Sequence, residues 1–287
     1  SKVERLVFLR SKVVKGESYS YLVKSKWDVE RKTSIQETVK YLGKTSRISM
    51  DDIPHEYQYN STILAFLANN KKIDAKRREK FILKIKKNTL KFLLSGDLDD
   101  LRLVFKNFRK TGTIPEFYEK ILRPAMYDIG GLWRDGKLDV GSEHVASNTV
   151  TRLIESMNSR IKSKSKTKTV LVCTPDGEYH IIPCLMIETY LSLKGYNVIN
   201  LAPSVPTKSL INHIDKEKPD LVLVSITLDE HVKAGMQLVK NIKKLKIPVI
   251  VGGQALKDNK YNFGVTVSVT PNFSELSKVV KREIAQR

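Results

Sequence analysis

The fold of the C-terminal part of this 287-residue chain is decided by the stretch Thr169-Val170-Leu171-Val172-Cys173-Thr174-Pro175-Asp176-Gly177-Glu178-Tyr179-His180. Its first five residues are apolar or β-branched throughout, which is typical of a strand buried on both faces, and the Pro-Asp-Gly sequence after them predicts a turn. Four similar runs follow and alternate with helical patterns at 181–194, 207–217, 229–244, 254–260 and 273–285; these runs are Asn197–Leu201, Leu221–Ser225, Val249–Val251 and Val265–Val267. This cadence predicts a flavodoxin-like, doubly wound parallel sheet of five strands over residues 168–287.

The residues before this sheet have the pattern of a four-helix bundle over 62–162. Apolar residues recur at helical spacing within Lys72–Leu94, from Leu101 to Phe105, from Pro115 to about Gly130-Gly131, and from Val140 to Ile161. Asp97 is placed to cap the second of these helices. Residues 46–72 read as a connector with one short helix, and Ser163–Lys168 as a basic linker.

The first 58 residues form a basic, β-rich segment. Strand-forming residues fill Val3–Val14, Tyr19–Trp27 and Thr33–Leu42, with turns predicted at Gly16 and Asp28–Lys32. Residues 1–47 hold 12 basic and five acidic side chains, and the whole chain has 51 Lys and Arg against 31 Asp and Glu, a net charge of +20. Such an excess favours DNA or another polyanion as a partner; the alternative is a lysine-rich surface that serves solubility. We therefore predict a multidomain α and α/β protein.

Polar and small residues follow three of the predicted strands at the edge where a doubly wound sheet binds its ligand. Glu178 and His180 follow the first strand, Ser225 and Thr227 the third, and Gly252-Gly253 the fourth. An imidazole can ligate a metal, an acidic residue two positions away can fix its tautomer, and glycines let another molecule approach closely. A single histidine on a loop is more often solvated surface, so the coincidence at three strand ends carries the prediction.

These residues resemble the motifs of cobalamin-binding domains, in which acid-x-His-x-x-Gly follows the first strand, Ser-x-Leu or Ser-x-Thr the third, and Gly-Gly the fourth. The resemblance implies a bound cobalamin. It implies that His180 is the lower axial ligand of the cobalt and that Glu178 is its hydrogen-bond partner. Ser225, Thr227, Gly252 and Gly253 would house the displaced nucleotide tail. Pro183 stands where the motif has glycine.

A second signature lies in the bundle, where Trp133 is followed after nine residues by Glu143 and His144. A tryptophan before a helix break is often plain core, and Glu-His in a first helical turn often only caps. The spacing nevertheless resembles the bundle of CarH-type cobalamin photoreceptors. That resemblance implies adenosylcobalamin, with Trp133, Glu143 and His144 lining its upper pocket. Arg134 replaces a histidine of those photoreceptors, and the basic β-rich segment stands in place of their helix-turn-helix domain.

Three functions remain open from the sequence. The first is a regulator in which adenosylcobalamin level or light controls how the basic N-terminal part engages DNA or transcription. The second is a corrinoid carrier for methyl transfer, with methylcobalamin. The third is a domain that kept the fold and lost the cofactor.

The sequence also sets some expectations about the setting of the protein. We find no complete enzyme motif and expect a non-enzyme. Since no run of about 18 apolar residues occurs, we expect no membrane span. Cys173 and Cys184 fall in buried elements, which favours a reducing, cytoplasmic compartment. A homo-oligomer is left open.

Overall fold

The chain divides into two compact units, Ser1–Leu83 and Lys84–Arg287, which are described here one at a time. The computed structural model describes residues 7–14, 17–159, 161, 168–258, 261–268 and 272–286. The predicted turn at Gly16, the start of the first predicted strand and residues 163–167 of the predicted linker lie outside these ranges. Within the described ranges, no helix is both long enough and apolar enough to cross a bilayer.

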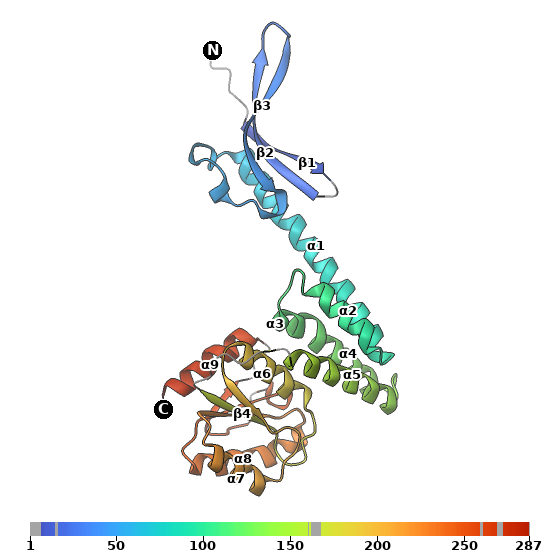
Figure 1. Cartoon of the computed structure of the whole chain (residues 1–287), viewed down its shortest axis with the longest axis vertical. Helices are drawn as coiled ribbons and strands as arrows, with labels where there is room; N and C mark the ends of the chain where they lie inside the picture. The colour runs from blue at the N-terminus through green and yellow to red at the C-terminus, as the bar shows by residue number, and fades with distance from the viewer. Residues whose placement is uncertain are drawn as a thin grey trace. The chain divides into compact units, whose positions relative to one another are not determined.

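The N-terminal unit contains the predicted β-meander. Strands β1 (Val7–Val14), β2 (Glu17–Asp28) and β3 (Thr33–Lys44) form an antiparallel sheet in the order β1-β2-β3, with β2 in the middle (Figure 1). The turn predicted after β2 is confirmed, because the Asp28 side chain accepts hydrogen bonds from the backbone amides of Glu30 and Arg31. Lys32 closes the turn with a positive φ of 47°.

One face of this sheet is buried against the segment that follows it. Leu9 and Leu22 pack there with Ile53 from the loop and with Ile63 and Leu67 from the next helix. Three short 3-10 turns, η1 (Thr45–Arg47), η2 (Met50–Asp52) and η3 (His55–Tyr57), carry the chain from β3 to that helix. The opposite face of the sheet is not part of this core.

Helix α1 (Ser61–Leu94) begins earlier than the sequence pattern predicts, and the expected start at Lys72 is wrong. The side chain of Asn60 accepts hydrogen bonds from the amides of Thr62 and Ile63, so it starts the helix directly after the 3-10 turns. The run 69–80 is polar almost throughout, which hides the helical spacing of the apolar residues on either side of it.

The first half of the C-terminal unit is a bundle of the end of α1, α2 (Leu98–Phe108), α3 (Ile114–Phe117), α4 (Arg123–Arg134) and α5 (Val140–Asn158). Asp97 caps α2 as predicted. A single π-helical turn, η4 (Tyr118–Leu122), joins α3 to α4. The predicted end at Gly130-Gly131 is wrong: both glycines lie inside α4, which closes only where Gly136 turns with a φ of 69°.

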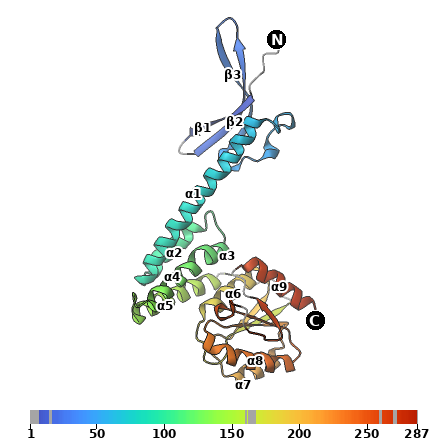
Figure 2. The ribbon, with the colours of Figure 1, turned by 180° about the vertical axis from the view of Figure 1, so that it is seen from behind.

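The second half is the predicted doubly wound sheet. Strands β4 (Thr169–Cys173), β5 (Asn197–Asn200), β6 (Leu221–Ser225), β7 (Val249–Gly252) and β8 (Thr266–Ser268) are parallel in the order β5-β4-β6-β7-β8. Helices cover both faces (Figures 1 and 2): α6 (Ile182–Leu193), α7 (Thr207–Glu217), η5 (Asp229–His231) with α8 (Val232–Lys244), and α9 (Phe273–Ala285). The helix expected at 254–260 is only a 3-10 turn, η6 (Gln254–Leu256); residues 259–260 lie outside the description.

The bundle is docked on the sheet domain through α6 and α9. The buried hydroxyl of Tyr118 donates a 3.0 Å hydrogen bond to Thr189 Oγ1 on α6. The carboxylate of Glu119 accepts a 2.7 Å bond from the backbone amide of Phe273, the first residue of α9. The Phe273 ring in turn stacks on Tyr190, with ring centroids 4.8 Å apart. Consecutive residues of η4 therefore hold both helices.

Candidate functional site

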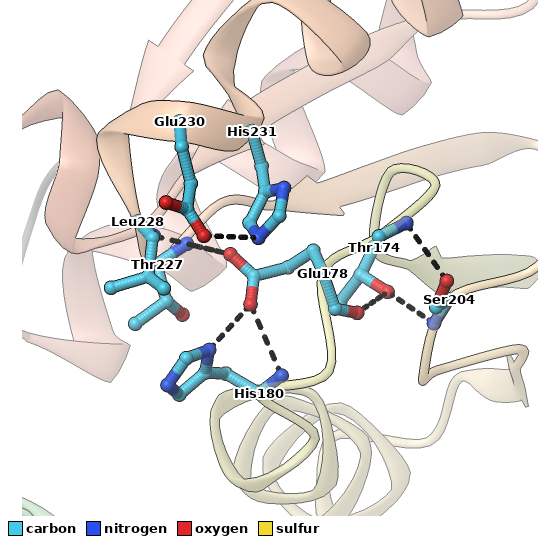
Figure 3. Close-up of polar contacts among 9 residues, drawn as sticks. Thr174, Glu178, His180, Ser204, Thr227, Leu228, Glu230 and His231 are labelled. Carbon is cyan, nitrogen blue, oxygen red and sulfur yellow. Dashed lines mark hydrogen bonds and ion pairs between the residues drawn. The ribbon is translucent and has the colours of Figure 1, made fainter.

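The carboxyl ends of β4 and β6 meet at the side chain of Glu178, which is fully buried. One carboxylate oxygen accepts a 2.5 Å hydrogen bond from His180 Nδ1 and a 3.1 Å bond from the His180 amide. The other accepts bonds of 2.8 and 3.1 Å from the amides of Thr227 and Leu228, directly after β6. Figure 3 shows Glu178 between these two loops, which it ties together.

The same contacts set the charges at the site. Burial by itself would raise the pKa of the Glu178 carboxyl, but the hydrogen bonds from His180, Thr227 and Leu228 outweigh it and lower that pKa to about 2. The hydrogen bond to Glu178 raises the pKa of His180, and the negative charge of Glu143 on the bundle adds to this rise. When the imidazole is neutral, donation from Nδ1 places the lone pair on Nε2, which is the nitrogen then able to ligate a metal.

The loop around Glu178 is braced by two residues that the sequence analysis did not single out. Thr174 Oγ1 donates a 2.9 Å hydrogen bond to the carbonyl of Glu178 and accepts one from the amide of Ser204. Ser204 Oγ accepts a further 2.9 Å bond from the amide of Gly177. Ser204 lies between Pro203 and Pro206 beyond the end of β5, and this proline-flanked strand end is the signal that could have identified it.

The predicted residues at the ends of β6 and β7 lie at the same edge of the sheet as Glu178 and have defined contacts within the protein. Ser225 is buried and pairs with Gly252 in the β6–β7 ladder. Thr227 reaches Glu178 through its backbone amide. At Gly253, whose φ is 122°, an added Cβ would lie 2.0 Å from the carbonyl oxygen of Ile226. Glycine is therefore required there by the chain's own backbone, whether or not a ligand approaches.

Pro183, which departs from the motif, lies in the first turn of α6, a position where proline fits a helix. Both cysteines are free and buried. Burial raises the pKa of the Cys184 thiol to about 12, with a hydrogen bond to Ser225 partly offsetting it, and the pKa of Cys173 is raised as well. The thiols are thus core residues beneath the site.

The bundle residues of the second signature lie at the ends of α4 and α5. Trp133 is in the last turn of α4 with half of its surface exposed, so it is not plain core. Glu143 is at the end of the first turn of α5 and His144 follows it, but Asp139 is the residue that caps this helix. The Glu143 carboxylate contacts His144 Nδ1 at 3.0 Å and accepts a 2.5 Å bond from Ser147 Oγ.

Comparison with known proteins places both halves of the C-terminal unit. Residues 168–269 match a family model described as a B12 binding domain, and residues 87–156 match a second model with the same description. The chain is 24% identical over 175 residues to the methanol–corrinoid protein of Methanosarcina barkeri. The aligned region covers 59% of this chain and 67% of that protein. It is 25% identical over 146 residues to the HTH-type transcriptional repressor CarH of Myxococcus xanthus, covering 50% of this chain and 48% of the repressor.

A solved structure agrees with this placement at the level of the fold. The monomethylamine corrinoid protein of Methanosarcina barkeri superposes with a TM-score of 0.60 over 69% of this chain and 97% of that chain, at 15% identity. The shared architecture is the helical bundle followed by the Rossmann-like sheet.

Proposed function

We propose that this cobalamin-binding protein is a regulator, in which adenosylcobalamin bound to the C-terminal unit controls how the basic N-terminal unit engages DNA, with light as the signal that removes the upper ligand. Cobalamin binding itself rests on the two matched B12 binding domains. The observation that carries it is the Trp133, Glu143, His144 set on the same unit as His180.

The chain carries residues suited to each side of the cofactor. His180 would offer Nε2 to cobalt, and Glu178 would orient its ring. The negative charge of Glu143, at the start of α5, contributes to the raised pKa of His180. Trp133 presents an exposed aromatic face that can cover an adenosyl group, and the Glu143 carboxylate can accept hydrogen bonds from ribose hydroxyls. When bound, the cofactor supplies a cobalt–carbon bond that light can break.

The proposed regulation rests on where these residues lie. Trp133, Glu143 and His144 would contact the cofactor from the bundle and His180 from the sheet domain, so the bound cofactor would join the two parts. The chain also carries an N-terminal unit with 12 basic and five acidic residues in its first 47 positions, a feature suited to a polyanion.

The test begins with the intact chain in the dark. Adenosylcobalamin is added, unbound cofactor is removed by desalting, and the visible spectrum is recorded before and after green light, together with the affinity for DNA. We expect a coloured, histidine-ligated complex whose spectrum and DNA affinity both change on illumination. A spectrum that changes while DNA affinity stays constant would refute the regulatory step, and a colourless protein would refute cofactor binding.

A second candidate is a corrinoid carrier that takes and gives methyl groups as methylcobalamin. The relatives favour it, because a methanol–corrinoid protein aligns with 59% of this chain. For this role we expect the bound corrinoid to accept a methyl group from a donor only when a partner methyltransferase is added. The variant Trp133→Ala, loaded with cofactor in the dark, distinguishes the two candidate functions. If the protein is a regulator, the variant loses the change in DNA affinity on illumination; if it is a carrier, the variant keeps methyl transfer.

A further inference from the structure

The outer face of the N-terminal sheet carries two rows of aromatic and basic side chains. The strand register pairs Arg10 with Tyr21 and Tyr21 with Tyr41, which makes one row across all three strands. It pairs Lys12 with Tyr19 and Tyr19 with Lys44, which makes the second. Side chains opposite one another in a ladder point to the same face. We call this set the tyrosine face, and its members are Arg10, Lys12, Tyr19, Tyr21, Tyr41 and Lys44.

The tyrosine face is opposite to the buried one. Leu9 and Leu22, which pair with each other, alternate along their strands with members of the tyrosine face and lie in the core with Ile53 and Ile63. An irregularity in the ladder between Leu22 and Val23, and another between Ser20 and Tyr21, let β3 bring Tyr41 opposite Tyr21 while Leu42 packs on the core. Tyr19, Tyr21 and Tyr41 thus lie on the face away from Leu9 and Leu22, while Val23, further along β2 on the same side, is buried.

The Tyr41 ring packs beside those of Tyr19 and Tyr21, which are partly buried, and is itself exposed. The ring centroids of Tyr21 and Tyr41 are 5.1 Å apart, and those of Tyr19 and Tyr41 are 6.4 Å apart with the planes 28° from parallel. Tyr41 has 54% of its surface exposed. A monomeric protein gains little from three clustered aromatic rings at its surface, so such a group is a candidate binding platform.

The charges around the rings specify the kind of ligand. Arg10 and Lys12 are exposed on β1, at one side of the rings, and Lys44 lies on β3 at the other side. Cations on both sides of an aromatic platform match a strand whose bases stack on the rings and whose phosphates run past the charges. In a duplex the base faces are already stacked on each other, so only unpaired bases can use the ring faces.

We propose that the tyrosine face binds a single-stranded nucleic acid, with bases stacked on Tyr19, Tyr21 and Tyr41 and phosphates held by Arg10, Lys12 and Lys44. This inference deepens the regulatory function proposed above, since it names the partner of the N-terminal unit and the surface that takes it. The affinity is expected to depend little on sequence, because every base has a stacking face.

The test measures binding of the intact chain, without cofactor and in the dark, to a fluorescent oligodeoxythymidine of about 15 nucleotides. We expect Tyr41→Ala and Tyr41→Leu each to weaken binding about 10-fold and Tyr41→Phe, which keeps the ring, to bind like the parent. Tyr59→Ala is the matched control, because Tyr59 is an exposed tyrosine of the same unit outside this sheet, at 83% exposure. Equal losses in Tyr41→Leu and Tyr59→Ala would overturn the proposal.

Two further measurements compare single-stranded with double-stranded ligands and test the contribution of a basic residue. A duplex of the same length is expected to bind at least about 10-fold more weakly than the single strand; equal or tighter duplex binding would overturn the stacking account. Lys12→Ala should weaken binding and flatten its salt dependence, whereas Lys87→Ala, on α1 in the other unit, should not. These measurements contain no cofactor, so they test the tyrosine face independently of regulation. If cobalamin and light turn out to have no influence on nucleic-acid binding, only the regulatory function is refuted.

Discussion

Glu178 uses its two carboxylate oxygens for different partners. One receives the ring and amide of His180, and the other receives two amides from the loop after β6. A carboxylate with four donors is held in one orientation, and it holds the imidazole in turn. The site is therefore organised by a residue that would not itself touch the metal.

Replacing this carboxylate should weaken cofactor binding without unfolding the domain. In Glu178→Gln one amide oxygen still accepts from the backbone, but the ring of His180 loses its charged partner. We expect the affinity for adenosylcobalamin to fall about 10- to 100-fold, measured by absorbance titration. Tyr179→Ala in the same loop is the control, since 71% of that side chain is exposed. Equal affinities for Glu178→Gln and the parent would show that the contact is incidental.

His180→Ala should remove the histidine-ligated absorption bands while leaving the circular dichroism spectrum unchanged, because about half of this side chain is exposed and little packing is lost. Desalting followed by visible spectroscopy checks this. If the variant retains as much corrinoid as the parent, with the same bands, His180 is not the lower ligand.

At this scale the sequence predicts contacts between neighbours and misses those made by the backbone. Glu178 and His180 are two positions apart, so their pairing can be expected from the motif. The bracing of Glu178 by Thr174 and Ser204 joins residues 30 positions apart in the chain and depends on the end of β5 lying beside that of β4. No motif spacing encodes such a contact.

At the scale of elements, replacing glycine by alanine should have opposite effects on stability in α4 and after β7. Gly130 is inside α4 with no atom within 4 Å of an added Cβ, so Gly130→Ala should raise the free energy of unfolding by about 0.5–1 kcal/mol. Gly253→Ala should lower it by about 2–4 kcal/mol, because the Cβ would strike the Ile226 backbone at a φ that alanine resists. Urea unfolding followed by circular dichroism measures both, and effects of the same sign would contradict this account.

The start of α5 gives a pH prediction. Hydrogen bonds from the Ser142 side chain and backbone lower the pKa of Asp139, so its contribution to stability is present above the usual pKa of 3.8 and is lost as the pH falls through the lower folded value. Asp139→Asn keeps an acceptor for Ser142 but has no charge.

We expect the Tm of Asp139→Asn to be below that of the parent at pH 7 and the gap to narrow as the pH falls below 3.8. Asp139→Ala should lose about 2–4 °C at pH 7. Asp99→Asn is the control, because it makes the same charge change on an exposed side chain that pairs with Arg102 and does not cap a helix. A gap that stays constant down to pH 3 would mean that the charge of Asp139 does not matter.

The three inner strands, β4, β6 and β7, are predictable to within a residue or two because each is a continuous apolar run between turns, which is typical of a strand buried on both faces. The helix boundaries were less accurate. The start of α1 depends on a capping side chain, Asn60, and the end of α4 on the turn at Gly136, and neither feature changes the apolar spacing on which the prediction was based.

For the whole molecule, the charge of +20 predicts salt-sensitive binding of polyanions. If the three cations of the tyrosine face each neutralise one phosphate of a single strand, the affinity should fall about 100-fold for a tenfold rise in salt concentration. Fluorescence anisotropy at several potassium chloride concentrations measures the slope. Affinity that is independent of salt would exclude the electrostatic account.

The order of the parts along the chain could be predicted from the sequence, because the switch from helical to strand periodicity near residue 168 is abrupt. The docking of the bundle on α6 and α9 could not, since it rests on Tyr118 and Glu119, which bond Thr189 and Phe273 at long range. Those two residues look unremarkable in the sequence: an aromatic and an acidic residue of an amphipathic helix.

Because Tyr118 and Glu119 lie in a π-helical turn, the docking of the bundle on the sheet domain depends on the number of residues in this segment. Such a turn holds one residue more than the regular spiral needs, and this surplus residue rotates everything on one side of it by about 100° relative to the other. A chain one residue shorter within 118–122 would lack this surplus residue. Its tyrosine and glutamate would then face a different direction from Thr189 and Phe273, so the fit between bundle and sheet is fixed by the length of this segment as much as by its chemistry.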